Sequence, residues 1–356
     1  MQLKDEYFPA DYFAARSAFR ERADDADKNA HNIAAPGPNG EALTIDSAYL
    51  GHPEPRQLVI ITSGIHGVEG YAGSALQQLW LTEFGKKLPA DTGVLLVHAL
   101  NPHGFAHNRR VNEHNVDLNR NALAAFPGPN NAGYRSLDTW LNPPNPAPRL
   151  DDFFWRALPR LRHGPSALVQ TIASGQYEFP RGLFYGGREH EPSITLFTRL
   201  LSAECFAGVQ RVWHIDLHTG LGRYGRYQWL LDVPPGEREL SMLTRGVDTQ
   251  TVQMNHAFRV THQSAHGILT TLTRRAFPQA MTLAATLEFG TLGPVTLLRI
   301  LRAENRVHHY GVRHGGDAIC LRAALRAAHA PRDPVWRARV IVGGRQVFTQ
   351  LRGMLG

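Results

Sequence analysis

Five short runs of apolar residues are spaced along the chain, and each ends in a polar or glycine-rich turn. They cover residues 58–62, 94–100, 212–217, 227–233 and 281–289. Runs of this length, without a strict alternation of apolar and polar positions, are typical of strands buried on both faces. The pattern therefore predicts a sheet that is covered by other elements on both sides.

Helical patterns lie between these runs, at 70–86, 149–162, 192–208, 238–250 and 294–328. The alternation predicts an α/β fold with a mixed, largely parallel twisted sheet flanked by helices on both faces. The stretch 127–148, rich in proline and asparagine, is interpreted as a long loop at the rim of a site. Because no repeat or linker divides the sequence, we predict a single domain over 1–356.

The composition favours a soluble protein without a nucleic-acid partner. The net charge is +7, but the basic residues are almost all arginines dispersed among acidic ones, which favours a solvated surface over a recognition patch. Cys205 and Cys320 match no metal-binding or redox spacing. With no leader pattern and no long apolar segment, we expect a cytoplasmic protein that does not contact membranes. The sequence carries no indication of the oligomeric state.

The first chemical motif follows the first strand, in SGIHGVEGYAG at 63–73. His66 and Glu69 stand three residues apart between glycines, so a tight turn into a helix can direct both at one point. An imidazole and a carboxylate are suitable ligands for zinc. Taken alone, the pair is a weak signal that favours an ordinary turn with a capping glutamate, and a metal site needs a third ligand.

The third ligand is expected at the carboxyl end of the run 212–217, where RVWHIDLHTG places His218. Three protein ligands and one open position for water are typical of a catalytic zinc. His214 and Asp216 share a face with His218 by the period of two. His214 lies deeper in the strand and is interpreted as a core residue. Asp216 is either a support for a ligand or a strand-end aspartate satisfied by backbone.

A carboxylate at the end of another strand provides a candidate base. Glu288 closes the apolar run 281–289 in TLEFGT, where an ionised carboxylate is costly unless it has a function. A glutamate in a dry site can take a proton from the zinc-bound water and pass it to the leaving amine. A structural ion pair with one of the many arginines is the alternative.

The segment NPHGFAHNRRVNEHNVDLNRN, at 101–121, is dense in groups that bind carboxylates. Arg120 beside Asn119 can hold a substrate carboxylate, and an arginine can do so with two parallel hydrogen bonds. Arg109 or Arg110 could stabilise the charge that develops on the attacked carbonyl oxygen. The sequence leaves the choice between these two arginines open.

Together, SGIHGVEG, RRVNEHNVDLNRN, DLHTGLG and EFGT resemble the zinc carboxypeptidases of the carboxypeptidase A type. Aspartoacylases and succinylglutamate desuccinylases are relatives in the same clan, and the four motifs together look like an uncharacterised bacterial subgroup of it. The order of HxxE, an Asn-Arg pair, a distant histidine and a late glutamate is the order of that family. The resemblance covers residues 55–295 and implies a carboxypeptidase-like catalytic core.

Carried over by position, the resemblance implies roles for seven residues. It implies that one zinc ion per chain is bound by His66, Glu69 and His218, that Glu288 is the general base, that Arg110 polarises the carbonyl, and that Asn119 and Arg120 hold the substrate carboxylate. Two features depart from the family. The spacing in sequence from Arg110 to Asn119 is shorter than in the digestive carboxypeptidases, which leaves Arg109 as an alternative. The tyrosine that closes over the substrate in those enzymes has no recognisable sequence context here, and Tyr177 and Tyr185 are only candidates for it.

The resemblance implies a zinc hydrolase that cleaves an amide or peptide bond next to a free carboxylate, with a metallocarboxypeptidase as the first hypothesis. An N-acyl amino acid amidohydrolase is the alternative, and an arginine-rich nucleic-acid binder or inactive binding module is a distant one. GLGRYG at 220–225 formally matches a dinucleotide-binding motif, but a strand-like segment follows it where a helix is required. The chain has no GxSxG or HExxH motif.

Overall fold

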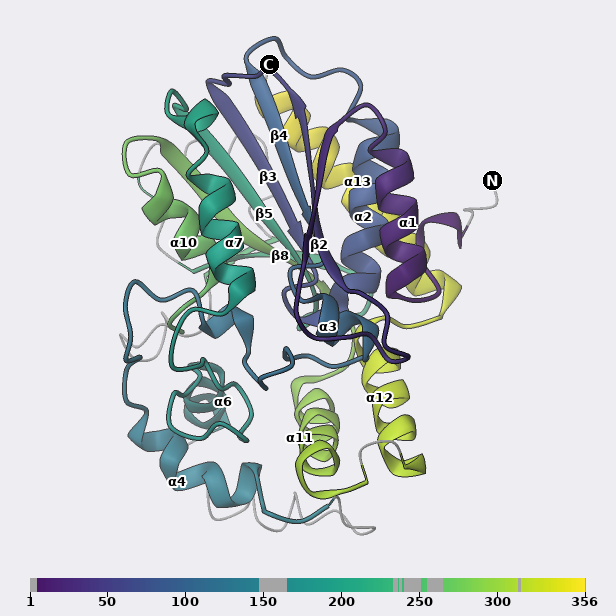
Figure 1. The fold of residues 1–356 in the computed structure, drawn as a ribbon, viewed down its shortest axis with the longest axis vertical. Helices are drawn as coiled ribbons and strands as arrows, with labels where there is room; N and C mark the ends of the chain where they lie inside the picture. Colours follow the sequence, from purple (N-terminus) through teal and green to yellow (C-terminus); the bar gives the residue numbers. More distant parts are fainter. Residues whose placement is uncertain are drawn as a thin grey trace.

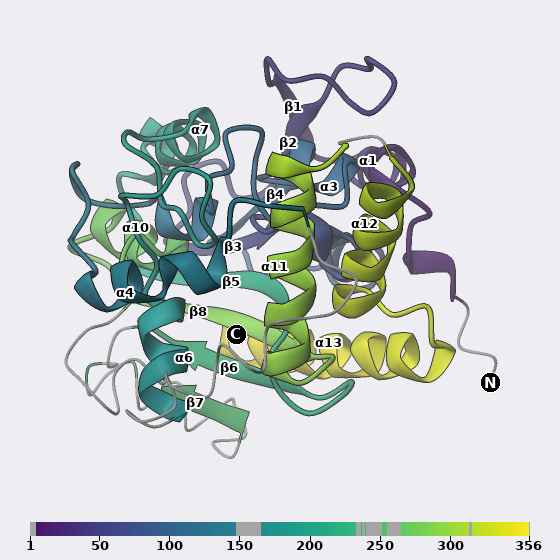
Figure 2. The same ribbon diagram turned by 90° about the horizontal axis from the view of Figure 1, so that it is seen from below.

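The fold is built on one eight-stranded sheet. The structure, a computed structural model, describes residues 5–146, 165–232, 236, 239, 251–254, 265–312 and 315–355. Within these residues the strands lie in the order β1-β2-β4-β3-β5-β8-β6-β7, which can be followed in Figure 1 and Figure 2 together. Their bounds are β1 Asp27–Asn32, β2 Thr44–Gly51, β3 Gln57–Ser63, β4 Thr92–His98, β5 Arg211–Gly220, β6 Tyr227–Leu231, β7 Val252–Met254 and β8 Met281–Gly290.

The four central strands, β4, β3, β5 and β8, are parallel neighbours, whereas β1, β2 and β6 pair antiparallel with the strands on their inner side. All five strands predicted from apolar runs are present, and β3 and β4 are buried along their whole length. The prediction of a mixed, largely parallel sheet is confirmed. Because the central strands are parallel, the residues that follow β3, β4, β5 and β8 meet at the same edge of the sheet.

Helices cover both faces of the sheet, as predicted. One face is covered by α1 (Tyr12–Arg22), α2 (Gly70–Glu83) and α13 (Pro334–Leu355), and the other by α7 (Pro192–Leu201) and α10 (Leu269–Ala276) (Figure 1). Each face has its own apolar core, with Trp80, Trp336 and Phe348 in the first and Phe197 and Leu269 in the second. This double cover explains why the central strands read as apolar runs.

A further group of helices lies beyond the carboxyl ends of the central strands. Figure 2 views the molecule from this side, where α11 and α12 lie next to each other. The group comprises α3 (Pro102–Ala106), α4 (Ala132–Leu141), α6 (Pro165–Ala173), α11 (Pro294–Tyr310) and α12 (Gly316–His329). Short 3-10 turns complete the fold: η1 (Asp5–Tyr7), η2 (Gly67–Glu69), η3 (Leu118–Arg120) and η5 (Glu204–Phe206).

The structure differs from three of the predicted helices and loops. The predicted helix 294–328 is two helices, α11 and α12, separated at Gly311 and Gly315, because glycine is a weak helix former and both residues are extended. The predicted loop 127–148 contains α4, which Asn131 caps by accepting the Tyr134 N–H. The predicted helix 192–208 ends early, at Leu201, before η5. The predicted helices 149–162 and 238–250 lie outside the described residues, apart from residue 239.

The strands β1 and β2 and the helices α1 and α13 have no counterpart in the sequence predictions. β1 is an edge strand with the polar sequence DKNAHN, so it lacks the apolar pattern of a buried strand. In β2, Asp46 is buried in ion pairs with Arg16 and Arg20 of α1, which breaks the apolar run. Among the described residues, no helix has both the length and the apolar character needed to cross a membrane.

Candidate metal centre

The turn after β3 places His66 and Glu69 at the end of the sheet. Gly64 has a positive φ of 64°, a conformation that favours glycine, and the chain then enters η2 and α2. A Cβ on Gly67 would come within 2.1 Å of the carbonyl carbon of Gly104 in α3, so only glycine fits at this position. The glycines in the motif are therefore required to hold the turn against α3.

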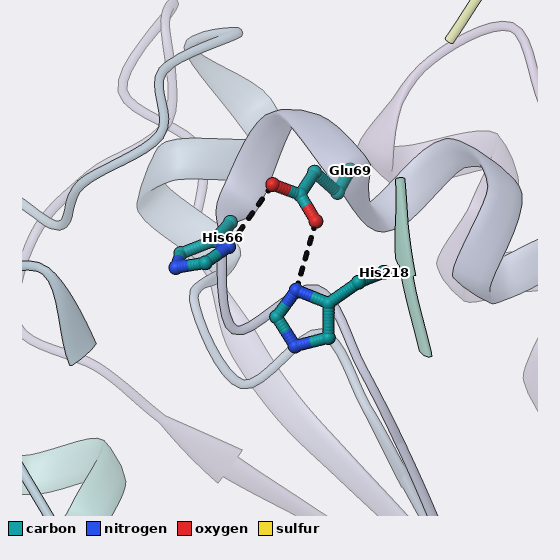
Figure 3. A group of neighbouring side chains, drawn as sticks. All are labelled: His66, Glu69 and His218. Atoms are coloured by element: carbon teal, nitrogen blue, oxygen red, sulfur yellow. Dashed lines mark hydrogen bonds and ion pairs between the residues drawn. The ribbon is translucent and has the colours of Figure 1, made fainter. Parts of the chain in front are cut away.

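His66, Glu69 and His218 converge on one point, as Figure 3 shows. Each residue offers a ligand atom, and these three atoms lie within 4.8 Å of one another. The Glu69 carboxylate lies between the two rings, with His66 Nδ1 at 3.0 Å from Oε1 and His218 Nδ1 at 3.0 Å from Oε2. The exposed fractions of the three residues are 4%, 2% and 4%. This is a buried group of two imidazoles and one carboxylate that could hold a metal ion.

The second nitrogen of each imidazole faces another carboxylate. Asp216 Oδ2 lies 2.6 Å from His218 Nε2, and Asp117 Oδ1 lies 3.1 Å from His66 Nε2. When Nδ1 gives its lone pair to a metal, Nε2 carries the proton and donates a hydrogen bond to the carboxylate. This hydrogen bond orients the ring and strengthens it as a ligand. Asp216 is thus placed to support one candidate ligand. Asp117, which sequence reasoning missed, lies beside the other.

The carboxylates of the site are held in their ionised form. Burial opposes ionisation of Glu69, but the charge of His66 and the hydrogen bond from His218 hold its pKa well below the usual value. Burial likewise opposes ionisation of Asp117, and the charges of Arg110 and His66 hold its pKa well below the usual value. Burial opposes protonation of His218, but its neighbouring carboxylates hold its pKa well above the usual value, so a metal cation would have to replace the extra proton on this ring.

Arg110 contacts the ligand group directly. Its Nε donates to Asp117 Oδ2 at 3.1 Å, and its Nη1 donates to Glu69 Oε1 at 3.4 Å. Its Nη2 lies 2.7 Å from His66 Nε2, and because a guanidinium can only donate, this contact and a proton on Nε2 exclude each other. The guanidinium also lies over the Phe184 ring, 5.2 Å from its centroid. A permanent positive charge thus stands beside the three candidate ligands.

The neighbouring Arg109 is placed away from the ligand group. It is 1% exposed, and its Nε donates to Glu304 Oε1 of α11 at 2.8 Å. Its Nη2 donates to Asn115 Oδ1 at 3.3 Å. Of the two arginines that the sequence left open, the structure brings only Arg110 to the candidate ligands, and Arg109 joins the 101–121 segment to α11.

Replacing Arg109 is expected to affect stability more than chemistry. In Arg109→Met, the buried Glu304 carboxylate loses its partner, so the free energy of unfolding should fall by about 3–5 kcal/mol. Urea unfolding measures this loss, and Arg135→Met, which breaks the exposed ion pair with Glu178, is the matched control. The double variant Arg109→Met/Glu304→Leu should recover most of the stability. A stable Arg109→Met protein that binds substrate poorly would instead place Arg109 in the site.

Glu288 lies beside His218, because β5 and β8 are parallel neighbours and the two residues are paired in the register. It is 7% exposed, and its Oε1 accepts the Leu221 N–H at 2.8 Å. Burial, together with the negative charge of Glu69, raises the pKa of Glu288 to about 7. No arginine ion pair with Glu288 occurs among the described residues, so a structural ion pair does not account for it. A carboxyl group with this pKa can both accept and release a proton near neutral pH.

Asn119 and Arg120 lie in η3, close to the supporting carboxylate Asp117. The Asn119 Oδ1 accepts the Leu269 N–H at the start of α10, so only its NH2 group could donate to a substrate. Backbone carbonyls accept three hydrogen bonds from Arg120: Ala173 O accepts from Nε and Nη2, and Asn119 O accepts from Nη1. At most two of its five N–H groups are left for a carboxylate.

The two candidate tyrosines have different surroundings. The Tyr177 hydroxyl donates to Arg120 O at 2.6 Å, which connects it to the proposed carboxylate-binding pair. Tyr185 is buried in the apolar core under α7, and its hydroxyl interacts with Arg188. The structure thus brings Tyr177, and not Tyr185, into contact with another predicted site residue. His214 is a core residue, as predicted, with its ring nitrogens hydrogen-bonded to Thr62 and Thr273.

Several solved structures are similar to this chain at low identity. They include carboxypeptidase A from Helicoverpa armigera, with 12% identity, coverage of 90% of this chain and 74% of the other, and a TM-score of 0.44. A metallo-carboxypeptidase from Pseudomonas aeruginosa has 15% identity, coverage of 98% and 71%, and a TM-score of 0.45. Succinylglutamate desuccinylase from Chromobacterium violaceum has 16% identity, coverage of 88% and 74%, and a TM-score of 0.37. No curated protein sequence matches the chain.

The sequence model of one protein family, in contrast, matches almost the entire chain. The match covers residues 8–343, from just before α1 into α13, and it includes every residue of the candidate metal centre. The description of this family is "Protein of unknown function (DUF2817)". The chain, with its buried His66, Glu69 and His218, belongs to the DUF2817 family.

Proposed function

We propose that this protein is a zinc-dependent hydrolase that cleaves an amide bond next to a free carboxylate. One observation carries the proposal: Glu288, a carboxyl group with a pKa of about 7, lies beside a buried group of two imidazoles and one carboxylate. A role in binding metal would explain why charged groups are buried at His66, Glu69 and His218. A role as the general base would explain why the buried Glu288 has no ion-pair partner among the described residues.

The donor set fits zinc. Two imidazole nitrogens and one carboxylate are a common set of protein ligands for catalytic zinc, and each imidazole here has the supporting carboxylate that such ligands usually have. His66, Glu69 and His218 would hold one ion per chain. When bound, zinc supplies a Lewis acid that activates water and polarises a carbonyl group.

The residues of the chain then perform the proton transfers and the binding. Glu288 takes a proton from the attacking water and delivers it to the nitrogen of the leaving amine, so its carboxylate is regenerated in each cycle. Arg110 stabilises the negative charge on the attacked carbonyl oxygen. Asn119 and Arg120 bind the free carboxylate of the substrate, and Tyr177 fixes the backbone of Arg120.

The first substrate class that we propose is a peptide cleaved at its C-terminal bond. A second class, N-acyl amino acids, is favoured by one observation, which is the depth of the site. The three ligands, Glu288 and Arg120 are all less than 9% exposed, so little surface is open to a long chain. A small acylated amino acid needs less room than a peptide does.

A substrate screen tests the proposal. The zinc-loaded protein is incubated with C-terminal dipeptides and N-acyl amino acids, together with the same compounds carrying a C-terminal amide in place of the carboxylate. We expect hydrolysis in one of the two classes, lost on chelation of zinc and reduced at least tenfold for the amidated compounds, because a charged hydrogen bond is worth about 1.5–3 kcal/mol. Equal rates for carboxylate and amide would contradict the roles of Asn119 and Arg120.

A further inference from the structure

A buried histidine outside the motif-bearing segment faces the metal centre. His329 is the last residue of α12 and is 2% exposed. α12 packs against η2 and β5, the elements that carry Glu69 and His218. Leu325, one turn earlier in α12, shares an apolar cluster with Val68 of η2. The C-terminal part of the chain thus contributes a titratable side chain to the wall of the site.

The orientation of the His329 ring follows from its contacts. Its Nδ1 lies 3.0 Å from Leu325 O, and a carbonyl oxygen can only accept, so Nδ1 carries the proton. A neutral ring then has a lone pair on Nε2, and burial lowers the pKa of His329, which favours this neutral form. The other edge of the ring faces the site: His329 Cδ2 lies 4.0 Å from the position of a Cβ on Gly220, and Glu288 Oε1 lies 3.2 Å from the same position.

The surroundings of His329 indicate what its lone pair can accept. The ring lies close to the centre where the substrate would react, because α12 packs on η2 and β5 and because His329 Cδ2 and Glu288 Oε1 approach the same point at Gly220. The carboxylates there have proposed functions already: Glu69 is a ligand, Asp117 and Asp216 face the two ligand rings, and Glu288 receives the proton of the attacking water. The N–H of the amide to be cleaved also loses water on binding, and a buried donor without an acceptor is costly.

We propose that His329 is a substrate-binding residue whose Nε2 accepts a hydrogen bond from the N–H of the scissile amide. The inference rests on the proposed function, and it adds a specificity: the site prefers a secondary amide over a matched ester, which lacks this N–H. A hydrogen bond between neutral groups contributes about three- to tenfold to binding of the reacting complex.

Two substitutions separate this role from a purely structural one. In His329→Asn the carboxamide lies where Nδ1 was, so the bond to Leu325 O can form but the acceptor at Nε2 is lost. In His329→Gln the carboxamide reaches the position of Nε2, so the acceptor is kept. Each protein is assayed on an N-acyl amino acid or dipeptide and on the ester in which oxygen replaces the N–H. Zinc content and the thermal midpoint are measured in parallel.

We expect His329→Asn to lower kcat/KM about three- to tenfold for the amide and to leave the ester unchanged, and His329→Gln to restore most of the amide rate. Equal losses for amide and ester, or loss in the Gln variant only, would overturn the contact. Nitrogen-15 NMR of labelled histidines gives a readout without turnover, since we expect a proton on Nδ1 and none on Nε2 of His329. A proton on Nε2 would overturn this inference alone, whereas a wild-type protein that cleaves neither compound would overturn the proposed function.

Discussion

His218→Ala is expected to bind zinc more than about a hundredfold more weakly than the wild type and to lose hydrolytic activity. The substitution removes one of three ligands, whereas loss of a supporting residue alone costs ten- to a hundredfold in affinity. It also leaves the Asp216 carboxylate without the ring that it faces. Metal analysis after dialysis gives the zinc content per chain, and a competition titration with a chelator gives the affinity.

His214 provides a matched control on the same strand. It is also buried, on the same face of β5, but its ring nitrogens are hydrogen-bonded to Thr62 and Thr273. His214→Gln should lower the thermal midpoint, because a buried hydrogen bond is lost, and should keep one zinc per chain. Full zinc content in His218→Ala, with loss of zinc in His214→Gln, would show that the third ligand has been assigned to the wrong histidine.

Glu288→Gln is expected to keep the zinc and to reduce turnover by about a hundredfold or more, the usual contribution of a general base. The carboxamide has nearly the same shape and can still accept the Leu221 N–H, so the fold should be retained. The measurement is kcat with the best substrate of the screen, at equal zinc occupancy. Glu304→Gln is the control, because this buried glutamate pairs with Arg109 and should affect stability and not turnover. Unimpaired turnover in Glu288→Gln would leave Glu288 with a structural role.

The same substitution has an expected effect on the metal-free protein. Burial raises the pKa of Glu288 from 4.5 to about 7, so the folded state favours the protonated form. The contribution of this group to stability is complete below pH 4.5 and is lost as the pH rises through 7. Glu288→Gln has no proton to lose and should exceed the wild type in stability at pH 8, by on the order of 3 kcal/mol, and match it in acid. Urea unfolding in the presence of a chelator at both pH values measures the difference.

The central sheet and the ligand set could be predicted because both depend on local patterns. Strands buried on both faces leave apolar runs, and parallel strands bring the residues that follow them to one edge. His66 follows β3, and His218 and Glu288 lie at the carboxyl ends of β5 and β8, so finding the strands was enough to bring them together. β1 could not be found in this way, because an edge strand needs no apolar face.

The residues that were missed or left open depend on tertiary contacts that leave no local pattern. Arg109 and Arg110 are equivalent in sequence, and only the position of α11 decides that Arg109 pairs with Glu304. Asp117 lies in a loop, two residues before Asn119, and a search for carboxylates that could support His66 would have listed it among several. His329 ends an alanine- and arginine-rich helix, α12. Only the break between α11 and α12 allows α12 to pack against η2 and β5, which places His329 at the site.

The packing of α13 has a consequence for the synthesis of the protein. Gln57 Nε2, at the start of β3, donates to Leu355 O at 3.0 Å, across 298 residues of sequence, and α13 covers α2 and one face of the sheet. The three ligands therefore leave the ribosome well before the helix that closes the core, because Leu355 follows His218 by roughly 140 residues, or on the order of ten seconds of translation. During this interval a chaperone, or the ribosome itself, would have to protect an open apolar sheet face, and stable insertion of the metal is expected only after α13 has left the ribosome and packed.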